Sequence, residues 1–170
     1  SIWLKKALEA LMPQVEKKRE EVCVYITDNA SMDDTESVVS FFMKKYSGMI
    51  DYYKQKHNNG YFENFNYGIK NIPAEYIFLH GDDDVVTPYF VDFILNVIRK
   101  NDGIAWIHFN YFLFDVKKKY TTIFKNELDT SIPIIQYTDS LQMMKDFMNA
   151  PSFMSSNIFR KEGWVENVGR

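Results

Sequence analysis

The sequence has little cysteine, glycine and proline, and no excess of basic residues. Its one cysteine, Cys23, excludes an internal disulfide and any cysteine-rich metal site. Seven glycines and five prolines are too few for a turn-dense all-β sandwich. Twenty basic residues stand against 23 acidic ones, which gives a net charge of −3. The basic surface that nucleic-acid binding requires is therefore absent, and no nucleic-acid partner is expected.

Long apolar runs are missing as well. No stretch approaches the roughly 20 apolar residues of a membrane-spanning helix. Hydrophobic residues nevertheless make up 46% of the chain and charged residues 25%, which excludes global disorder. With 170 residues the chain has the length of one domain, residues 1–170, that can bury a real core. Cys23 lies in an apolar run and is expected to be buried and unreactive.

Helical and strand patterns alternate along the first 100 residues. Leu4, Leu8 and Leu11 recur at helical spacing and predict a helix that ends near Pro13. Further helices are predicted from residues 31–33 to Gly48, and over 61–71 and 88–100. Short strands are predicted over 22–26, 49–53 and 76–79. This alternation predicts an α/β fold with a mostly parallel sheet flanked by helices.

The pattern changes after residue 100 and becomes aromatic and strand-rich. Strands are predicted over 104–114, 120–124, 134–137 and 155–159, with one helix over 139–149. No repeat, low-complexity segment or domain boundary is visible. We therefore expect residues 1–100 to form the larger half of one domain and residues 101–170 a smaller, mixed half.

Three polar clusters follow the predicted strands, where ligands bind in open α/β sheets. They are residues 28–35 (DNASMDDT), residues 58–60 (NNG, followed by Asn64 and Asn66) and residues 81–84 (GDDD). The first also fits a helix N-cap, and the second a tight turn. The third fits a solvated turn less well, because three adjacent carboxylates repel one another unless a cation is present.

A hard cation fits the third cluster. Mg²⁺ and Mn²⁺ accept one or two carboxylates and complete their coordination with water and phosphate oxygens. In an extended segment, residues two apart point to the same side, so Asp82 and Asp84 are expected to face one ion while Asp83 points elsewhere. Asp28, at a strand end, is placed to accept hydrogen bonds from a ribose or a base.

These motifs together resemble a known family. The segments VYITDNASMDDTESVV, NNGYFENFNYGIK and EYIFLHGDDDVVTPYF resemble, in order and spacing, the bacterial family-2 glycosyltransferases of the GT-A fold. In that family a strand ends in an aspartate-rich motif, an asparagine and glycine loop follows, and a later strand ends in a DxD motif. The resemblance is clear from residue 2 to about residue 100, and the later SFMSSNIFRKEGW resembles the acceptor side only loosely.

The resemblance implies roles for individual residues. Asp28 and Asn29 would contact the nucleoside base, and Asn59 and Gly60 would line the nucleotide pocket. In the third cluster, Asp82 would lie near the ribose and the metal, Asp83 near the donor sugar, and Asp84 would be the principal ligand of Mn²⁺ or Mg²⁺.

The resemblance also implies a reaction. A hexose or related sugar would pass, with inversion, from a nucleotide-diphosphate donor to the hydroxyl of a glycan or lipid-linked acceptor, in the assembly of cell-surface polysaccharide or lipopolysaccharide. We expect a cytoplasmic location at the inner face of the membrane. Lys117, Lys118 and Lys119 fit a solvated turn better than a contact with anionic lipid headgroups. The oligomeric state stays open.

The sequence departs from the family pattern twice. The family's first strand, which would precede the first helix, is absent, so the sheet is expected to lack a central member. No clear catalytic base follows Asp84. Asp115, Glu162 and Glu166 are the candidates, and each fits an ordinary surface charge better. These departures favour a rival, a non-catalytic nucleotide-sugar-binding or scaffold domain. A metal-dependent phosphohydrolase fits less well, because no nucleophilic aspartate motif follows the first predicted strand.

Overall fold

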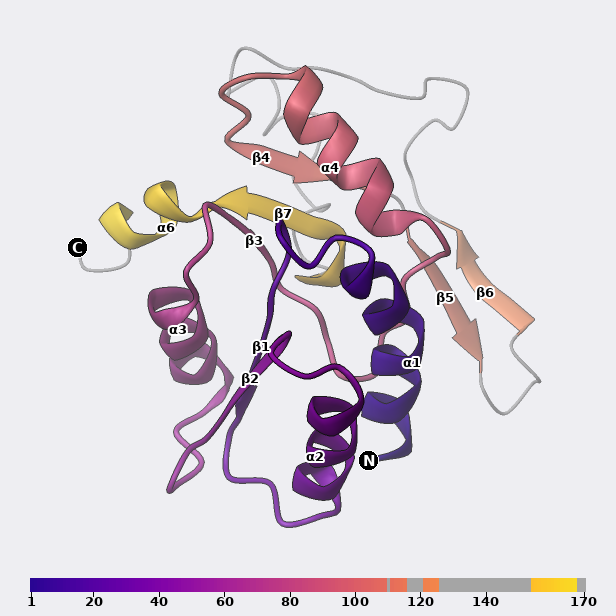
Figure 1. Ribbon diagram of the computed structural model, residues 1–170, viewed down its shortest axis with the longest axis vertical. Helices are drawn as coiled ribbons and strands as arrows, with labels where there is room; N and C mark the ends of the chain where they lie inside the picture. The colour runs from indigo at the N-terminus through magenta and orange to yellow at the C-terminus, as the bar shows by residue number, and fades with distance from the viewer. Residues whose placement is uncertain (110, 116–120, 126–153, 168–170) are drawn as a thin grey trace.

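The computed structural model describes residues 1–109, 111–115, 121–125 and 154–167 (Figure 1). Three predictions fall on residues outside these ranges: the strand over 134–137, the helix over 139–149 and the lysine turn at 117–119. Among the described residues, no helix combines the length and the apolar character that crossing a bilayer requires.

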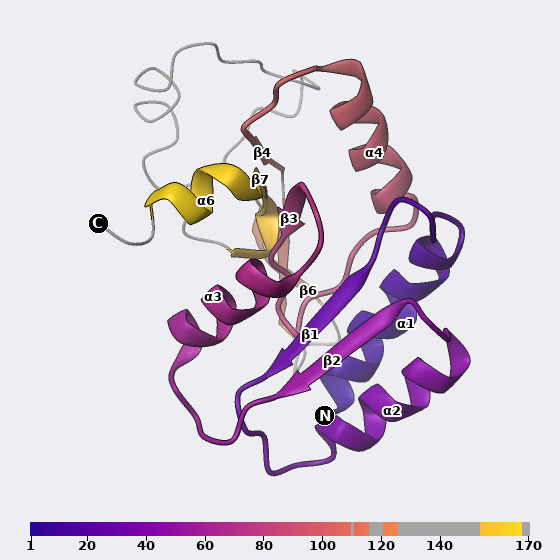
Figure 2. The ribbon, with the colours of Figure 1, turned by 60° about the vertical axis from the view of Figure 1, so that its left-hand side comes forward.

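The first half is built around two parallel strands, β1 (Val24–Asp28) and β2 (Ile50–Lys54), which pair in register from Val24 with Ile50 to Asp28 with Lys54. Helices α1 (Ile2–Glu16) and α2 (Thr35–Lys45) lie on one side of this pair, and α3 (Tyr61–Asn71) lies on the other (Figure 2). The α/β class, with a parallel sheet flanked by helices, is therefore confirmed.

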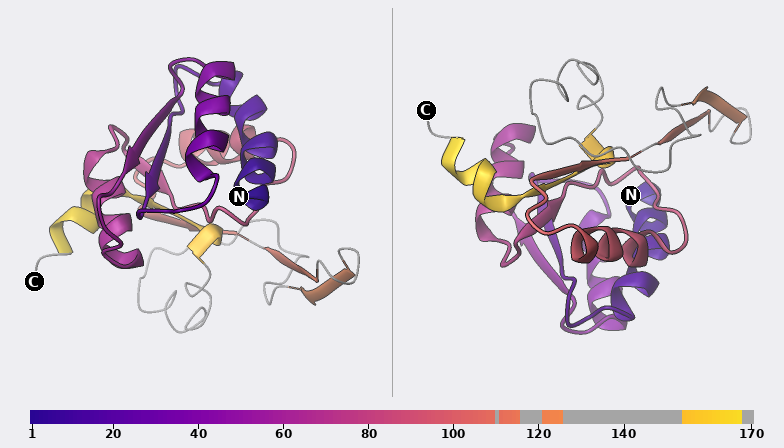
Figure 3. Two further views of the ribbon diagram at one scale, coloured as in Figure 1. Left: turned by 90° about the horizontal axis from the view of Figure 1, so that it is seen from below. Right: turned by 90° about the horizontal axis from the view of Figure 1, so that it is seen from above.

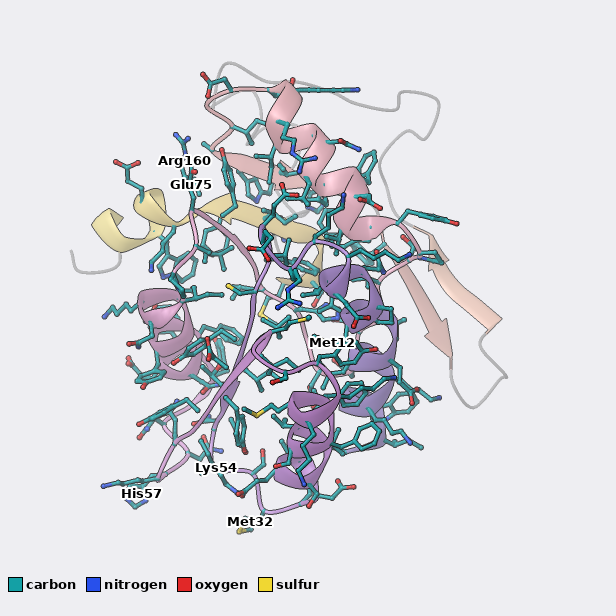
Figure 4. The ribbon with its side chains drawn as sticks, in the orientation of Figure 1. Met12, Met32, Lys54, His57, Glu75 and Arg160 are labelled. Atoms are coloured by element: carbon teal, nitrogen blue, oxygen red, sulfur yellow. The ribbon has the colours of Figure 1, made fainter. Side chains whose placement is uncertain are left out.

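The main core fills the space between α1, α2 and β2. Each of these elements presents apolar residues to the core, at the helical period of about 3.6 residues or the strand period of about two. In Figure 4, Met12 points into this interior while Met32 points out from the loop before α2. The buried members of the core are Leu4, Leu8, Met12, Val15, Val39, Phe42, Tyr46, Met49 and Ile50.

Helix α1 does not end at Pro13, as the sequence predicted, but continues to Glu16. Pro13 lacks the N–H that would bond one turn back, which costs the helix a hydrogen bond. However, Met12 and Val15 on either side are both 0% exposed, so burial of the next turn outweighs that loss. Gln14 also connects α1 to helix α4 (Phe90–Lys100) by a hydrogen bond, since its Oε1 accepts the Val91 N–H at 3.2 Å.

The second sheet has three strands, with the last strand of the chain in its centre. β7 (Asn157–Arg160) pairs antiparallel with both β3 (Tyr76–Phe78) and β4 (Trp106–His108). At one edge Arg160 Nη2 lies 2.7 Å from Glu75 Oε1 (Figure 4). Helix α6 (Lys161–Asn167) follows β7 directly. The parallel sheet is narrower than predicted because β3 pairs with β7 and not with β1.

Two further strands form a separate hairpin. β5 (Phe112–Asp115) and β6 (Thr121–Lys125) pair antiparallel with a register shift between Leu113 and Phe114. Figure 3 shows this hairpin extending away from the helices that surround β1 and β2. It therefore lies apart from the strand ends that carry the polar clusters.

Several predicted details differ in the structure. Cys23 is exposed, because it precedes β1 and lies at the edge of a cavity. Phe93 of α4 is a large apolar side chain that is 53% exposed. Helices α2 and α4 begin a few residues later than expected, at Thr35 and Phe90, whereas α3 has the predicted limits.

A large cavity separates β1 from β3. Its volume is about 1020 Å³, and residues of both strands line it together with α1, α3 and α4. The two strands belong to different sheets and do not pair with each other. Val24 N–H and Asp28 C=O bond toward β2, so the backbone groups of Tyr25 and Thr27, in alternation, face the other way.

The continuation of α1 through Pro13 leads to a prediction. Pro13→Ala should stabilise the protein by about 1–3 kcal/mol, because alanine restores a helical hydrogen bond at an exposed position. The measurement is thermal or urea unfolding. Pro88→Ala is the matched control, since Pro88 is exposed but lies outside any helix, and no gain is expected there. A loss of stability in Pro13→Ala would contradict the prediction.

Candidate functional site

The polar clusters lie where β1, β2 and β3 end. Asp28 is the last residue of β1, the NNG segment follows β2, and the GDDD segment follows β3. The cavity between β1 and β3 brings the first and third clusters together, since Asp28, Asn29, Asp82 and Asp83 all line it. Asn59 and Gly60 are not among its lining residues. One end of the cavity is thus acidic and polar, while its walls are largely apolar.

Asp28 is buried, with 4% of its surface exposed, and both of its oxygens are hydrogen-bonded. Oδ1 accepts the Ser31 N–H at 2.7 Å, and Oδ2 accepts the Tyr52 hydroxyl at 2.6 Å. Burial acts to raise the pKa of Asp28, but these hydrogen bonds and the Lys54 charge outweigh it and hold the pKa below its ordinary value. Asp28 is therefore an ionised structural anchor in this fold.

The turn after β1 is strained at Ala30. Ala30 has φ +65°, a left-handed conformation that costs a residue with a Cβ. The bond from Ser31 N–H to Asp28 spans this residue and holds the turn closed. The carboxylate at the end of β1 thus fixes the backbone of the loop that leads to α2.

Asn29 uses its amide to hold the loop after β2. Its Nδ2 donates to Asn58 Oδ1 at 2.8 Å, and its Oδ1 accepts the Asn59 N–H at 2.9 Å. Gly60, with φ +84°, takes a left-handed conformation that favours glycine, and its N–H donates to Asn58 Oδ1 at 3.0 Å. Asn29, Asn58 and Gly60 therefore form one connected unit across two strand ends.

Gln55 and Asn64 extend this amide network to β1. Asn59 Nδ2 donates to Gln55 Oε1 at 2.6 Å, and Gln55 Nε2 donates to Asn64 Oδ1 at 2.8 Å. Asn64 Nδ2 then donates to the Thr27 carbonyl at 3.1 Å. The sequence pointed to Asn59 but not to Gln55, because an isolated glutamine in a polar loop is typical of an ordinary surface residue.

The GDDD segment forms a hydrogen-bonded turn, which we call the triple-Asp turn (residues 81–84). The Asp84 N–H donates to the Gly81 carbonyl at 3.3 Å. The prediction of an extended backbone is therefore wrong. The alternation that would place Asp82 and Asp84 on one side does not apply to a turn. Asp82 and Asp83 are exposed, whereas Asp84 is half-buried. A Cβ built on Gly81 would lie 2.7 Å from Asp84 Oδ2 and 3.1 Å from Asp83 Oδ1, so these two carboxylates converge there.

This turn has the donor set that a hard cation prefers. No lysine or arginine of the described residues forms an ion pair with Asp82, Asp83 or Asp84, so their charges are not neutralised by that part of the protein. The described part of the chain contains no group of three or more histidine, cysteine, aspartate or glutamate side chains that could hold a metal ion. The chain thus offers one or two carboxylates, and water or phosphate oxygens would complete the coordination of Mg²⁺ or Mn²⁺.

His80 lies between the turn and the cavity. Both ring nitrogens are buried, and neither has a hydrogen-bond partner among the residues that the structure describes. Burial lowers the pKa of His80, against the opposing charges of Asp84 and Asp83. No sequence pattern pointed to His80, because the position of its ring depends on the tertiary fold.

The triple-Asp turn is also hydrogen-bonded to a residue from the late part of the chain. Ser155 Oγ accepts the Gly81 N–H at 2.8 Å, and Ser155 lies in the short 3-10 helix η2 (Met154–Ser156) that precedes β7. No sequence pattern pointed to Ser155, since a pair of serines before a strand does not indicate a hydrogen-bond partner. Its contact with Gly81 depends on the pairing of β7 with β3.

The three candidate bases do not gather at the triple-Asp turn. Glu162 is exposed in α6 and shares a surface hollow with Glu75, which precedes β3, while the turn follows β3. Asp115 lies in the outlying hairpin. Glu166 lies in α6, and its side chain is outside the described residues. Glu162 thus lies away from the turn, and the base role of Asp115 and Glu166 stays a prediction.

The hydrogen bonds of Asp28 lead to a prediction about pH. Asp28→Asn should destabilise the protein by about 1.5–3 kcal/mol at pH 7, the value of bonds to a charged acceptor. Because the folded-state pKa of Asp28 is lowered, its contribution is present above the unfolded value of about 3.9 and is lost as the pH falls through the folded pKa. The difference from wild type should therefore shrink below about pH 4.

Urea unfolding at a series of pH values measures this difference. Asp102→Asn, at an exposed turn residue, is the control and should change little at any pH. A difference between Asp28→Asn and wild type that stays constant from pH 7 to pH 3 would show that the carboxylate charge is not the cause.

Comparison with known proteins identifies the family. Residues 3–167 match the model of the family described as "Glycosyl transferase family 2". The chain is also 28% identical over 116 residues to a protein described as an uncharacterized glycosyltransferase of Rickettsia typhi. That alignment covers 68% of this chain and 34% of the relative, so the chain spans about a third of the relative's length. The α/β fold and the family match agree, and this chain belongs to glycosyl transferase family 2.

Proposed function

We propose that this protein transfers a sugar from a nucleotide-diphosphate donor to an acceptor hydroxyl. The observation that carries the proposal is the triple-Asp turn, whose carboxylates converge beside Gly81 at the end of the cavity that Asp28 also lines. A net-acidic protein needs a cation to hold a diphosphate, and this turn has the oxygen donors for one.

The sequence resemblance suggests the proposed roles, and the geometry of the strand ends supports some of them. Asp84, half-buried beside Gly81, would be the principal ligand of Mn²⁺ or Mg²⁺, with Asp82 or Asp83 as the second carboxylate. The ion would neutralise the charge that develops on the departing diphosphate. Asp28 and Asn29 would accept hydrogen bonds from the nucleoside, since each of their partnered oxygens keeps a second lone pair. For Asn59 and Gly60, which do not line the cavity, the resemblance alone supports a place in the nucleotide site.

We further propose that the sugar is transferred in a single displacement, which inverts its configuration. The acceptor would be a glycan or a lipid-linked glycan at the inner face of the membrane. The product would serve the assembly of cell-surface polysaccharide or lipopolysaccharide. Support for these finer points comes from the sequence resemblance alone. A binding domain without transfer activity is the alternative, and it is favoured because no clear catalytic base follows Asp84 in the sequence. The experiment below distinguishes the two.

The metal test uses binding of UDP and GDP, measured by calorimetry with Mn²⁺ and with EDTA. We expect binding to need Mn²⁺ and Asp84→Asn to weaken it at least tenfold, roughly the loss of one charged ligand. Asp82→Asn and Asp83→Asn show which neighbour is the second ligand. Asp102→Asn is the exposed control.

Equal affinity with Mn²⁺ and EDTA would rule out the metal role of the triple-Asp turn. Metal-dependent binding of the full-length protein to nucleotide sugars, without hydrolysis or transfer, would favour the binding domain over the enzyme.

We also propose that a further strand fills the cavity between β1 and β3. A strand that precedes α1 and lies parallel to β1 would reach this position by a right-handed crossover, the handedness that such connections almost always have. It would pair with the backbone groups of Tyr25 and with the Thr27 N–H, while the Thr27 carbonyl already accepts Asn64 Nδ2. We propose that further residues of the same protein supply it.

The test compares the 170-residue chain with a longer form of the protein. The longer form should protect the Tyr25 and Thr27 amides from hydrogen exchange, because they would then be bonded within the sheet. It should also transfer sugar to a crude lipid-linked acceptor fraction, while the short chain is poorly active. Full activity of the short chain, or equal exchange in both forms, would overturn this proposal.

A further inference from the structure

We propose that Ser155 is a positioning residue that holds the triple-Asp turn in the shape needed to bind a divalent cation. The proposal rests on the proposed function of that turn and adds a residue from the opposite half of the chain. Ser155 would not touch the ion or the donor. Its hydroxyl would act through the backbone of Gly81, to which it is hydrogen-bonded.

The contact is short and partly buried. Ser155 Oγ accepts the Gly81 N–H at 2.8 Å across 74 positions of sequence, and Ser155 is 7% exposed. Gly81 is also the first residue of the turn, because its carbonyl accepts the Asp84 N–H. Both backbone groups of Gly81 are therefore engaged, one by Asp84 within the turn and the other by Ser155 from outside it.

The carboxylates pack around the same point. A Cβ on Gly81 would lie 3.3 Å from Ser155 Oγ as well as 2.7 Å from Asp84 Oδ2 and 3.1 Å from Asp83 Oδ1. The hydroxyl and the two acidic side chains thus converge on the open side of Gly81. A shift of the Gly81 backbone would move the carboxylates relative to each other, and cation affinity depends on their spacing.

Ser155 lies directly before a strand that is hydrogen-bonded on both sides. The next residue, Ser156, is 0% exposed, and its carbonyl accepts the Phe109 N–H at 3.0 Å. From Asn157 onward β7 pairs with β3 on one side and β4 on the other. Because β3 leads directly into the turn, the strand that positions Ser155 and the strand that positions Gly81 are neighbours in one sheet.

The experiment measures Mn²⁺ binding to the full-length protein by electron paramagnetic resonance, with no nucleotide added. Ser155→Ala should weaken Mn²⁺ binding roughly tenfold, the loss expected when one hydrogen bond that fixes a site is removed. Ser155→Thr keeps the hydroxyl and should bind nearly as well as wild type. The Gly81 amide proton should move upfield in the NMR spectrum of Ser155→Ala, because it loses its acceptor.

Ser156→Ala is the matched control. It removes a neighbouring buried hydroxyl that lies 3.3 Å from Asn157 Nδ2 and 3.4 Å from His108 Nδ1. If Ser155 were only structural, both variants would lower the melting temperature alike and leave Mn²⁺ affinity unchanged, and that result would overturn the proposal. Should Ser155→Ala fail to fold, Ser155→Cys replaces it, since a thiol is a weaker acceptor of similar size.

Asp84→Asn in the same assay separates the two proposals. Weaker Mn²⁺ binding in Asp84→Asn together with unchanged binding in Ser155→Ala would overturn the role of Ser155 and keep the metal site. Unchanged binding in Asp84→Asn would overturn both. Weaker binding in both variants, with Ser155→Thr close to wild type, is the expected result.

Discussion

The pairing of β7 with β3 is the interaction on which the rest of the candidate site depends. β3 has three residues and would be a weak element alone, but β7 gives it a hydrogen-bonded neighbour along its whole length. The Glu75–Arg160 ion pair lies at one end of this ladder, and the Ser155–Gly81 contact lies at the other. The acidic turn is therefore shaped by residues from the far end of the chain.

Two different physical devices hold the two polar strand ends. At the end of β1, a buried carboxylate with two strong hydrogen bonds fixes a strained loop, and a row of side-chain amides ties that loop to α3. At the end of β3, the carboxylates carry no described basic partner and converge beside a glycine. The carboxylate at the first end is hydrogen-bonded within the protein, whereas the carboxylates at the second end form no ion pair with a described basic residue.

The cavity between β1 and β3 explains why the α/β class is clear while the sheet is divided. Helices α1, α3 and α4 cover the faces that a continuous sheet would present, and their apolar residues line the space between the strands. Burial of α1 is strong enough to carry the helix through Pro13. The layers thus form without every strand of the sheet being paired to its neighbour in space.

The sequence by itself determined the alternation of helices and strands, the limits of α3, and the three polar clusters at strand ends. These follow from local periodicity and from residue types whose preferences act over a few positions. Only the tertiary structure decided that β3 pairs with β7, that the triple-Asp segment is a turn, and that Gln55 and Ser155 support the site. The β3–β7 pairing and the Ser155 contact join residues far apart in the chain, and no local pattern encodes which distant partner a strand edge or a hydroxyl will meet.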